Sequence, residues 1–358
     1  MARIALLLPN LLAGGAERVT LTLAAEFVAF GDDVDLVLLQ AEGALMDAIP
    51  AGVRVIVLEA KRLRNAIRPL KAYLERERPD ALLAQMWPLS SIGVWACRQS
   101  STRVVVVEHV QLSAYSRSWP LLAKAMLRPI IRWTHPRAVE RIGVSHGVAA
   151  DLARLCGMSV EAVTAVHNPI ALPDTLSLAA SPDWGTMHGR RFLTVGTLKR
   201  QKNQRLLIEA FARICRPEDR LAIVGEGPER QDLERTAKAL GMSKQVLLPG
   251  FTSDPGPWYA SANLFVLSSD YEGFANVVAE ALGHGLTVAS TDCPSGPAEI
   301  LSGLGRLAPV GDADGLATAM RNALAEPDDP ATARTRAAAF APPGIARKYR
   351  QLLLGTEP

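Results

Sequence analysis

Two carboxylates, Glu272 and Glu280, lie in a stretch of sequence whose residue types suit the binding of one extended ligand. The apolar run 263–267 predicts a buried strand, and residues 277–282 have the pattern of a helix. We therefore expect Glu272 in a strand-to-helix loop and Glu280 about two turns into the helix. Carboxylates placed in this way would hold a ligand at two points, whereas a pair for glycoside hydrolysis would lie much closer together.

The loop between the two carboxylates is expected to present backbone N–H groups at the start of the helix. Its residues are Gly273, Phe274, Ala275 and Asn276, followed by Val277. Such N–H groups form a ready site for an anion. An anion flanked by two hydroxyl-binding carboxylates describes a nucleotide sugar. The alternative is one capping acid and one solvated helical glutamate.

This motif resembles the signature of the family 4 retaining glycosyltransferases, in which Gly-Phe follows the first glutamate and seven residues separate the two glutamates. The resemblance implies an α/β protein with the GT-B fold, in which two doubly wound parallel-sheet (Rossmann-like) domains face a cleft. It also implies that Glu280 binds the ribose hydroxyls and that the catalytic Glu272 contacts the donor sugar. The amides of residues 275–277 would then hold the diphosphate.

A second group of candidate residues lies on the loop that follows the predicted strand 192–195. Gly196 begins the loop, and the catalytic candidate Lys202 precedes a predicted helix. Cations there would stabilise the negative charge of a leaving nucleoside diphosphate. The family usually has Arg directly after this glycine, and Thr197 departs from that pattern. Either Arg200 or Lys199 takes over the role, or Lys202 acts alone; the alternative is a loop of surface cations.

His109 is the third catalytic candidate. It follows Glu108 at the end of the predicted strand 104–107, on the sheet edge where parallel α/β proteins place their sites. A lone histidine is usually structural. The resemblance implies instead that His109 lies near the donor sugar and orients both the sugar and the incoming acceptor hydroxyl.

Further donor-binding candidates are glycines at strand ends. Gly14 and Gly15 precede the predicted helix 16–30, where they either let a ligand approach the backbone or make a tight turn. The string Gly-Gly-Ala-Glu resembles the acceptor-side loop of the family, whose amides approach the donor phosphate. The resemblance also places Gly225 and Gly227 near the donor and Phe251 beside the base.

Several other patterns exclude classes of function. The fingerprint Gly-x-Gly-x-x-Gly is missing, which argues against a dehydrogenase, and no Gly-x-Ser-x-Gly elbow of a hydrolase occurs. The string Asp33-Val34-Asp35 imitates a metal motif, but we interpret it as a solvated turn after Gly31. We expect no metal and no other cofactor. The four cysteines are far apart, so we expect isolated buried thiols in a reducing compartment.

Short apolar runs alternate with helical segments along the whole chain, which predicts parallel sheets covered on both faces. The predicted strands are 4–8, 34–39, 53–58, 81–86, 104–107 and 142–144, and then 192–195, 221–224, 246–248, 264–267 and 287–289. We therefore predict an N-terminal acceptor-binding domain over 1–168, a linker over 169–189 and a nucleotide-sugar-binding domain over 190–340. Residues 341–358 are predicted to form a helix that returns to the first domain.

The net charge of +3 is unevenly distributed. Residues 61–141 carry fifteen Lys or Arg against five acids, whereas residues 1–60 carry three Arg against eight acids. Within the basic tract, Lys124, Arg128 and Arg132 fall at helical spacing among apolar and aromatic residues, and Pro129 is expected to break or kink that helix. We expect this tract to contact an anionic membrane surface and not nucleic acid. The alternative is a charged helix face above a core stripe.

Together with these patterns, the resemblance implies a metal-independent retaining glycosyltransferase of the cytoplasm, peripheral on the inner face of the cell membrane. It would transfer an α-linked hexose or N-acetylhexosamine from a nucleoside-diphosphate sugar to a lipid-linked or oligosaccharide acceptor. The string 292–300 resembles a subgroup that builds bacterial polysaccharides, which favours a UDP-linked donor. The alternatives are an epimerase or phosphorylase of the same fold, and a catalytically dead nucleotide-sugar-binding protein.

Overall fold

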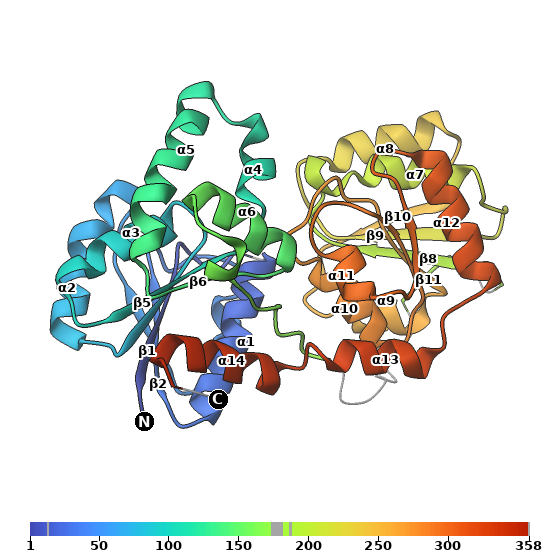
Figure 1. Ribbon diagram of the computed structural model, residues 1–358. Helices are drawn as coiled ribbons and strands as arrows, with labels where there is room; N and C mark the ends of the chain where they lie inside the picture. The colour runs from blue at the N-terminus through green and yellow to red at the C-terminus, as the bar shows by residue number, and fades with distance from the viewer. Residues whose placement is uncertain (13, 173–181, 186–187, 357–358) are drawn as a thin grey trace. The chain divides into compact units, whose positions relative to one another are not determined.

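The computed structural model describes residues 1–12, 14–172, 182–185 and 188–356 in two compact units (Figure 1). The first unit comprises Met1–Ile170 and Phe340–Pro358, and the second comprises Ala171–Ala339. Residues 173–181 and 186–187 of the predicted linker lie outside the described part of the chain. Each unit is built around a parallel sheet with helices on its faces, so the predicted α/β fold is confirmed.

The first unit contains, within the described residues, a seven-stranded sheet of order β3-β2-β1-β4-β5-β6-β7. Its strands are β1 (Arg3–Leu8), β2 (Asp33–Leu38), β3 (Val53–Val57), β4 (Ala81–Gln85), β5 (Arg103–Glu108), β6 (Glu140–Gly143) and β7 (Thr164–Ala165). Its α-helices are α1 (Gly15–Ala29), α2 (Ile67–Glu77), α3 (Leu89–Ala96), α4 (Leu112–Tyr115), α5 (Leu121–Thr134), α6 (His146–Cys156) and α14 (Pro342–Leu354). The central strands β1, β4 and β5 are almost wholly buried, as apolar runs between two helical layers require.

The second unit contains, in the part of the chain that is described, a six-stranded sheet of order β10-β9-β8-β11-β12-β13. Its strands are β8 (Arg191–Val195), β9 (Arg220–Val224), β10 (Val246–Gly250), β11 (Leu264–Leu267), β12 (Val288–Thr291) and β13 (Arg306–Ala308). Its α-helices are α7 (Gln204–Ala212), α8 (Arg230–Ala239), α9 (Gly256–Ser261), α10 (Asn276–Gly283), α11 (Pro297–Leu301), α12 (Ala313–Ala325) and α13 (Pro330–Ala338). The prediction missed the outer strands β7 and β13, which are too short to form an apolar run.

The last helix, α14, packs on α1, β4 and β5 of the first unit. Arg350 donates two hydrogen bonds to the buried carboxylate of Asp32, at 2.6 and 2.9 Å. Burial alone would raise the pKa of Asp32, but the hydrogen bonds from Arg350 hold it below its usual value. Arg103 of β5 also donates to the carbonyl of Leu353 at 2.9 Å. These contacts fasten the C-terminal helix to the first sheet.

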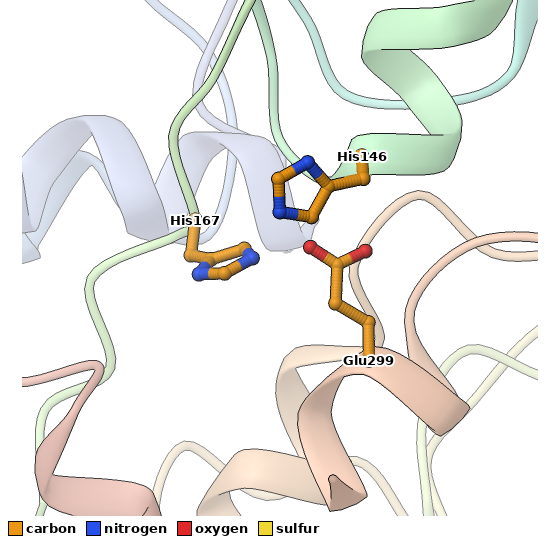
Figure 2. A group of neighbouring side chains, drawn as sticks. All are labelled: His146, His167 and Glu299. Atoms are coloured by element: carbon orange, nitrogen blue, oxygen red, sulfur yellow. The ribbon is translucent and has the colours of Figure 1, made fainter.

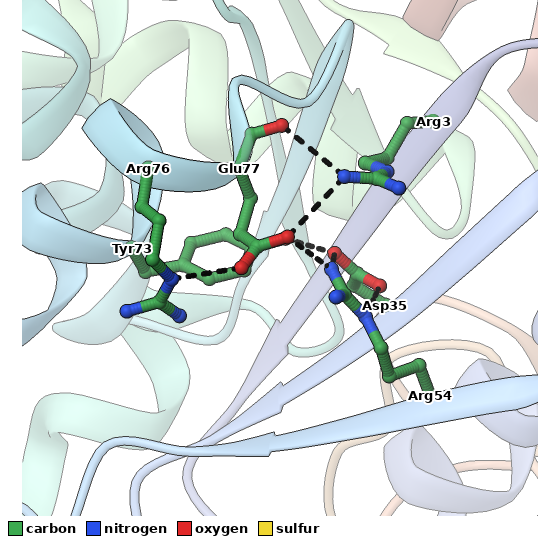
Figure 3. Close-up of polar contacts among 6 residues, drawn as sticks. All are labelled: Arg3, Asp35, Arg54, Tyr73, Arg76 and Glu77. Atoms are coloured by element: carbon green, nitrogen blue, oxygen red, sulfur yellow. Dashed lines mark hydrogen bonds and ion pairs between the residues drawn. The ribbon is translucent and has the colours of Figure 1, made fainter.

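The string Asp33-Val34-Asp35 is not the solvated turn that the sequence predicted. β2 begins at Asp33, and Asp35 is buried within it. Figure 3 shows why this is tolerated: Arg54 of β3 binds both oxygens of Asp35, at 2.8 and 2.7 Å, and the Tyr73 hydroxyl donates at 2.7 Å. These bonds replace the water that a buried carboxylate would otherwise need.

Helix α5 continues through Pro129, so of the two predicted effects of this proline, a break or a kink, the break is wrong. Proline removes one helical hydrogen bond, but tertiary packing holds the two halves together. Leu127 lies before the proline, and Ile131 and Thr134 lie after it, and all three side chains are buried against the rest of the unit. By contrast, the first turn of α5 is exposed, including Leu121 (86%) and Leu122 (78%).

Candidate functional site

The second unit joins two residues that the sequence singled out separately. Lys202 Nζ lies 2.6 Å from Glu272 Oε1, although 70 residues separate them in the chain. Ser269 donates its hydroxyl to the same oxygen at 2.6 Å. The side chains of Lys202 and Glu272 are only 17% and 7% exposed. An ion pair with so little access to water is held in one geometry, which is what a charge-stabilising site requires.

Two loops at the carboxyl edge of the second sheet hold this pair. Lys202 ends the short 3₁₀ turn Arg200–Lys202 after β8, and Glu272 lies between β11 and α10. Hydrogen bonds join the loops: Asn203 Nδ2 donates to Asp270 Oδ1 and Gln201 Nε2 donates to the Tyr271 carbonyl, both at 2.8 Å. Sequence reasoning missed these supports, because each links residues 67 or 70 positions apart without a local pattern.

The loop after Glu272 leads into the N-terminus of α10, as predicted. Helix α10 begins at Asn276 with the left-handed Ala275 (φ 62°) before it, and this N-cap residue has no polar side chain that could cap the helix. Gly296 packs so closely here that a Cβ atom on it would lie 2.6 Å from the Phe274 carbonyl oxygen. Gly273, Phe274 and Ala275 are themselves buried. An uncapped helix start of this kind suits an anion.

Glu280 is the fifth residue of α10, so it lies in the second turn and not about two turns in, because the helix begins only at Asn276. Its Oε2 atom accepts a hydrogen bond from the Tyr259 hydroxyl at 2.8 Å. Phe251 follows β10 and is 52% exposed. A half-exposed aromatic ring at a strand end is available to a flat ligand.

The close packing of two loops at this edge requires three of the predicted glycines. Gly196 and Gly225 both have positive φ, at 152° and 147°, and a Cβ atom on Gly225 would lie 2.0 Å from the Gly196 carbonyl oxygen. A Cβ atom on Gly227 would lie 2.4 Å from the carbonyl oxygen of Leu198. The loops after β8 and β9 therefore touch only because these residues lack side chains.

The cations of the β8 loop differ in their surroundings. Thr197, Lys199 and Arg200 are exposed, whereas Lys202 points into the ion pair with Glu272. Within the described ranges, Arg200 makes no ion pair. The ion pair with Glu272 thus holds Lys202 in place.

At the carboxyl edge of the first sheet, His109 follows β5 and contacts Gln85 at the end of β4. Gln85 Oε1 lies 3.0 Å from both His109 Nε2 and Thr20 Oγ1 of α1. Burial lowers the pKa of His109 to about 4 against the opposing charge of Glu108. His109 is therefore a neutral side chain at physiological pH. Counting only described residues, His109 Nδ1 and Gln85 Nε2 are buried without a hydrogen-bond partner.

Behind His109 lies a buried polar network that sequence reasoning missed. Glu108 accepts hydrogen bonds from the Ser90 hydroxyl at 2.6 Å and from the Trp87 amide at 2.9 Å. His135 Nε2 lies 3.3 Å from Glu108, and His135 Nδ1 lies 3.0 Å from Thr134 Oγ1. The network connects the strand end that carries His109 with the C-terminal end of α5.

The other predicted glycines of the first unit lie at the start of α1. Gly14 is the N-cap residue in an extended conformation, and Gly15 is the first helical residue. Ala13, which precedes them, lies outside the described residues. Gly14 has no side chain that could cap α1, and a Cβ atom on Gly14 would collide with the carboxylate of Glu17 in the first turn.

A pocket of about 300 Å³ opens near the carboxyl ends of β1, β2 and β4 in the first unit. Its polar lining comes from Asn10, Gln40 and Lys61, and Trp87 contributes an aromatic wall. The Trp87 ring stacks on Trp119, with centroids 5.0 Å apart. The rest of the lining is mostly apolar, so the pocket combines a few polar side chains with an apolar and aromatic wall, as ligand pockets usually do.

Figure 2 shows three further side chains with metal-ligating atoms. His146 begins α6 and His167 follows β7 in the first unit, whereas Glu299 belongs to α11 of the second unit. The rings of His146 and His167 lie 6.0 Å apart, edge to face, and His167 also packs on Phe340 at 5.4 Å. Two histidines held in aromatic packing do not by themselves make a metal site.

The four cysteines are free, as the sequence predicted, and all but the half-buried Cys215 are buried. Cys293 lies near the Lys202–Glu272 pair, and burial raises its pKa to about 12. No helix in the described part of the chain is both long and apolar enough to cross a membrane.

Two family models match the chain. The family described as "Glycosyltransferase Family 4" matches residues 13–172, and the family described as "Glycosyl transferases group 1" matches residues 189–326. Between them, these matches include every candidate residue described above.

The proteins to which the chain is similar include two curated relatives and one solved protein. N-acetylgalactosamine-N,N'-diacetylbacillosaminyl-diphospho-undecaprenol 4-alpha-N-acetylgalactosaminyltransferase of Campylobacter jejuni is 32% identical over 232 residues, which is 63% of each chain and thus less than two thirds of that relative. The amylovoran biosynthesis glycosyltransferase AmsD of Erwinia amylovora is 24% identical over 293 residues, 80% of each chain. HepE of Anabaena, solved with UDP and with UDP-glucose, matches 99% of this chain and 100% of its own, with TM-scores of 0.79 and 0.81 and identities of 21% and 20%.

Proposed function

Because the chain belongs to the family 4 glycosyltransferases, we propose that it transfers an α-linked sugar from a UDP-sugar to a lipid-linked saccharide in the synthesis of a bacterial cell-surface polysaccharide. The observation that carries this proposal is the buried Lys202–Glu272 pair beside the uncapped start of α10. The printed names of the relatives support the class of reaction, and the nucleotides bound to HepE support the class of donor.

In the proposed reaction, Lys202 and the first amides of α10 bind the diphosphate of the donor, and Lys202 stabilises its charge as it departs. Glu280 binds the ribose, Phe251 lies by the base, and Glu272 contacts the donor sugar. A role for Glu272 as a nucleophile is disfavoured, because its Oε1 atom already receives hydrogen bonds from Lys202 and Ser269.

Retention of the anomeric configuration is therefore proposed to occur by attack on the same face that the leaving group departs from. The acceptor oxygen forms a bond to the anomeric carbon as the bond from that carbon to the phosphate oxygen breaks. The acceptor proton passes to the departing phosphate, so no enzyme base and no metal ion is needed. The neutral His109 would orient the sugar without taking this proton.

The acceptor is proposed to bind the first unit, in the pocket that Lys61 and Trp87 line. Lys61 would pair with the phosphate of a lipid-linked acceptor, and Trp87 would stack on a sugar ring. The printed name of the Campylobacter jejuni relative, which includes diphospho-undecaprenol, supports an acceptor of this class.

Helix α5 is proposed to rest on an anionic membrane that carries such an acceptor. Its exposed face combines three apolar side chains with cations: Leu121, Leu122 and Met126, with Lys124 and Arg128. Apolar side chains can enter the headgroup region while the cations pair with anionic lipids. We call these five residues the α5 face. Liposome flotation tests this part: binding to anionic vesicles that weakens with salt supports it, and failure to float at low salt contradicts it.

The central test is a thermal-shift screen of the purified protein with UDP, GDP, ADP and their sugar conjugates, with and without EDTA. We expect a shift with UDP and UDP-sugars that EDTA does not reduce. Product analysis by NMR should then show an α-linkage formed only when an acceptor is present. Release of free sugar without acceptor would indicate an epimerase, dependence on phosphate a phosphorylase, and binding without turnover a dead site. A screen in which no nucleotide shifts the melting temperature would contradict the proposal.

A further inference from the structure

Tyr259 occupies a buried position between two elements of the second unit. It comes from α9, and its side chain is 1% exposed. Its ring stacks on His284 at the end of α10, with centroids 5.1 Å apart and planes at 15°, and lies 5.7 Å from Phe265 of β11. This packing fixes the ring, so the position of its hydroxyl is fixed as well.

The Tyr259 hydroxyl has one proton to donate, and two acceptors lie within reach. Glu280 Oε2 lies at 2.8 Å and the Val277 carbonyl oxygen at 3.5 Å, so the proton belongs to the bond with Glu280. Burial, together with the charge of Glu280, raises the pKa of Tyr259 well above its usual value. The phenol therefore stays protonated and remains a donor. A hydrogen bond to a carboxylate is stronger than one between neutral groups.

The Glu280 side chain has three rotatable torsions on a partly exposed helix face, and the bond from Tyr259 restricts them. A carboxylate that binds the vicinal hydroxyls of a ribose must hold one orientation to accept from both. Ordering it only when the ligand arrives would reduce affinity, whereas ordering it beforehand avoids that loss.

We infer that Tyr259 is a positioning residue for nucleotide recognition, which holds the Glu280 carboxylate ready for the two ribose hydroxyls. The inference rests on the proposed function, in which Glu280 binds the ribose. It does not depend on the base, because UDP, GDP and ADP share the ribose. Tyr259 itself, being buried behind Glu280, acts through that carboxylate and not on the ligand.

The test compares Tyr259→Phe with Tyr349→Phe. Both substitutions remove one buried hydroxyl and keep the ring. Among the residues that the structure describes, Tyr349 is fully buried in α14 and its hydroxyl has no hydrogen-bond partner, so its loss controls for the chemical change alone. The ligands are whichever of UDP, GDP and ADP the wild-type protein binds most tightly, and the 2′,3′-dideoxy form of that nucleotide. Affinities are measured by isothermal titration calorimetry.

We expect Tyr259→Phe to bind the ribonucleotide about three- to tenfold more weakly and to bind the dideoxynucleotide unchanged. In turnover, KM for the donor should rise by a similar factor while kcat stays nearly constant, as for a loss of uniform binding. Tyr349→Phe should change neither affinity.

Two results would overturn the inference and leave the proposed function standing. One is a Tyr259→Phe variant that prefers the ribonucleotide over the dideoxynucleotide by the same factor as the wild type. The other is an equal loss of affinity for both nucleotides, which would mean that the hydroxyl only supports the local packing. If the wild-type protein binds none of the three nucleotides, the proposed function fails together with the inference, so the two failures are distinguishable.

Discussion

The polar groups at the carboxyl edges of the two sheets differ in charge and in how fully they are hydrogen-bonded. On the second sheet, Lys202 and Glu272 form an ion pair, and Ser269 completes the contacts of the carboxylate. On the first sheet, His109 is neutral, and within the described chain its Nδ1 atom and Gln85 Nε2 have no partner. One edge is therefore organised in advance around charge. The other presents neutral groups whose hydrogen bonds a ligand would complete.

The largest expected effect comes from breaking the charged edge with Lys202→Met. The substitution keeps much of the side-chain volume but removes the cation, so the leaving diphosphate loses its charge partner. We expect kcat to fall about 10²- to 10³-fold, or about 3–4 kcal/mol of transition-state stabilisation. The measurement is steady-state release of the nucleoside diphosphate, with thermal unfolding as a check on folding.

The matched control is Lys244→Met, which removes an exposed cation of the same unit. Its kcat should stay within about twofold of wild type, since an isolated surface charge contributes little. A kcat for Lys202→Met within threefold of wild type would show that the ion pair only supports the fold.

The sequence predicted the strands, loops and helix start that carry the charged edge, because these elements follow short local patterns. Glu272, Glu280 and the start of α10 lie in one strand-loop-helix unit, and the spacing between Gly196 and Lys202 is equally local. It did not predict the bond between Asn203 and Asp270, because nothing in the residues near either one indicates the other. Tertiary pairing alone brings them together.

Asp35 is a second residue whose environment could not be predicted from its neighbours in the sequence. An aspartate soon after Gly31 is typical of a turn, and its burial makes sense only with Arg54 and Tyr73 in place. Arg54 is opposite Asp35 because β2 and β3 pair in a particular register, in which residue 35 aligns with residue 54. Register follows from the packed sheet and not from the composition of either strand.

The second prediction concerns a buried ion pair of the first unit that lies apart from the candidate site and should affect stability but not catalysis. Arg54→Met removes the partner of a carboxylate whose side chain is only 3% exposed, while Arg54 itself is 44% exposed. An unpaired buried charge is strongly destabilising, and the partial exposure of Arg54 moderates the effect. We expect a loss of about 2–3 kcal/mol in unfolding free energy, with kcat unchanged below the melting temperature. Urea unfolding followed by tryptophan fluorescence measures it.

Arg76→Met is the control for Arg54→Met. Arg76 pairs with Glu77 at 2.8 Å but is 63% exposed, so its loss should cost less than about 1 kcal/mol. The hydrogen bonds from Arg76 and Arg54 lower the pKa of Glu77 to about 2, so this carboxylate is charged throughout the assay range. Equal destabilisation by the two variants would mean that the burial of Asp35 does not decide the effect.

The third prediction concerns the α5 face. Replacing both Leu121 and Leu122 by Ser removes the two most exposed of its apolar side chains. We expect binding to anionic vesicles to weaken by about 2 kcal/mol, or roughly thirtyfold, because less apolar area enters the headgroup region. Activity on a water-soluble acceptor should not change. Vesicle co-sedimentation at low salt measures the binding.

Leu240→Ser is the matched control for the α5 face, because Leu240 is 41% exposed but lies in the second unit. It should bind vesicles as the wild type does. If the double serine variant also binds as well as wild type, then charge alone holds the protein to the vesicle, or the contact lies elsewhere. Either result would contradict the proposed role of α5.

The smallest expected effect is the contribution of His109 to the pH dependence of stability, which tests whether the carboxyl edge of the first sheet is neutral. The folded-state pKa of His109 is about 4, below the usual value of 6.5, because the ring is buried. Between these two values the unfolded chain binds the proton and the folded protein does not, so stability falls as the pH falls from 6.5 toward 4. Between pH 7 and pH 5 this loss of stability amounts to about 1–2 kcal/mol.

The variant His109→Asn should lose correspondingly less stability over that range in urea unfolding. The control His188→Asn, which removes an exposed histidine, should follow wild type. An unchanged slope in His109→Asn would mean that the folded protein and the unfolded chain protonate His109 at the same pH, so the first edge would become charged within this range.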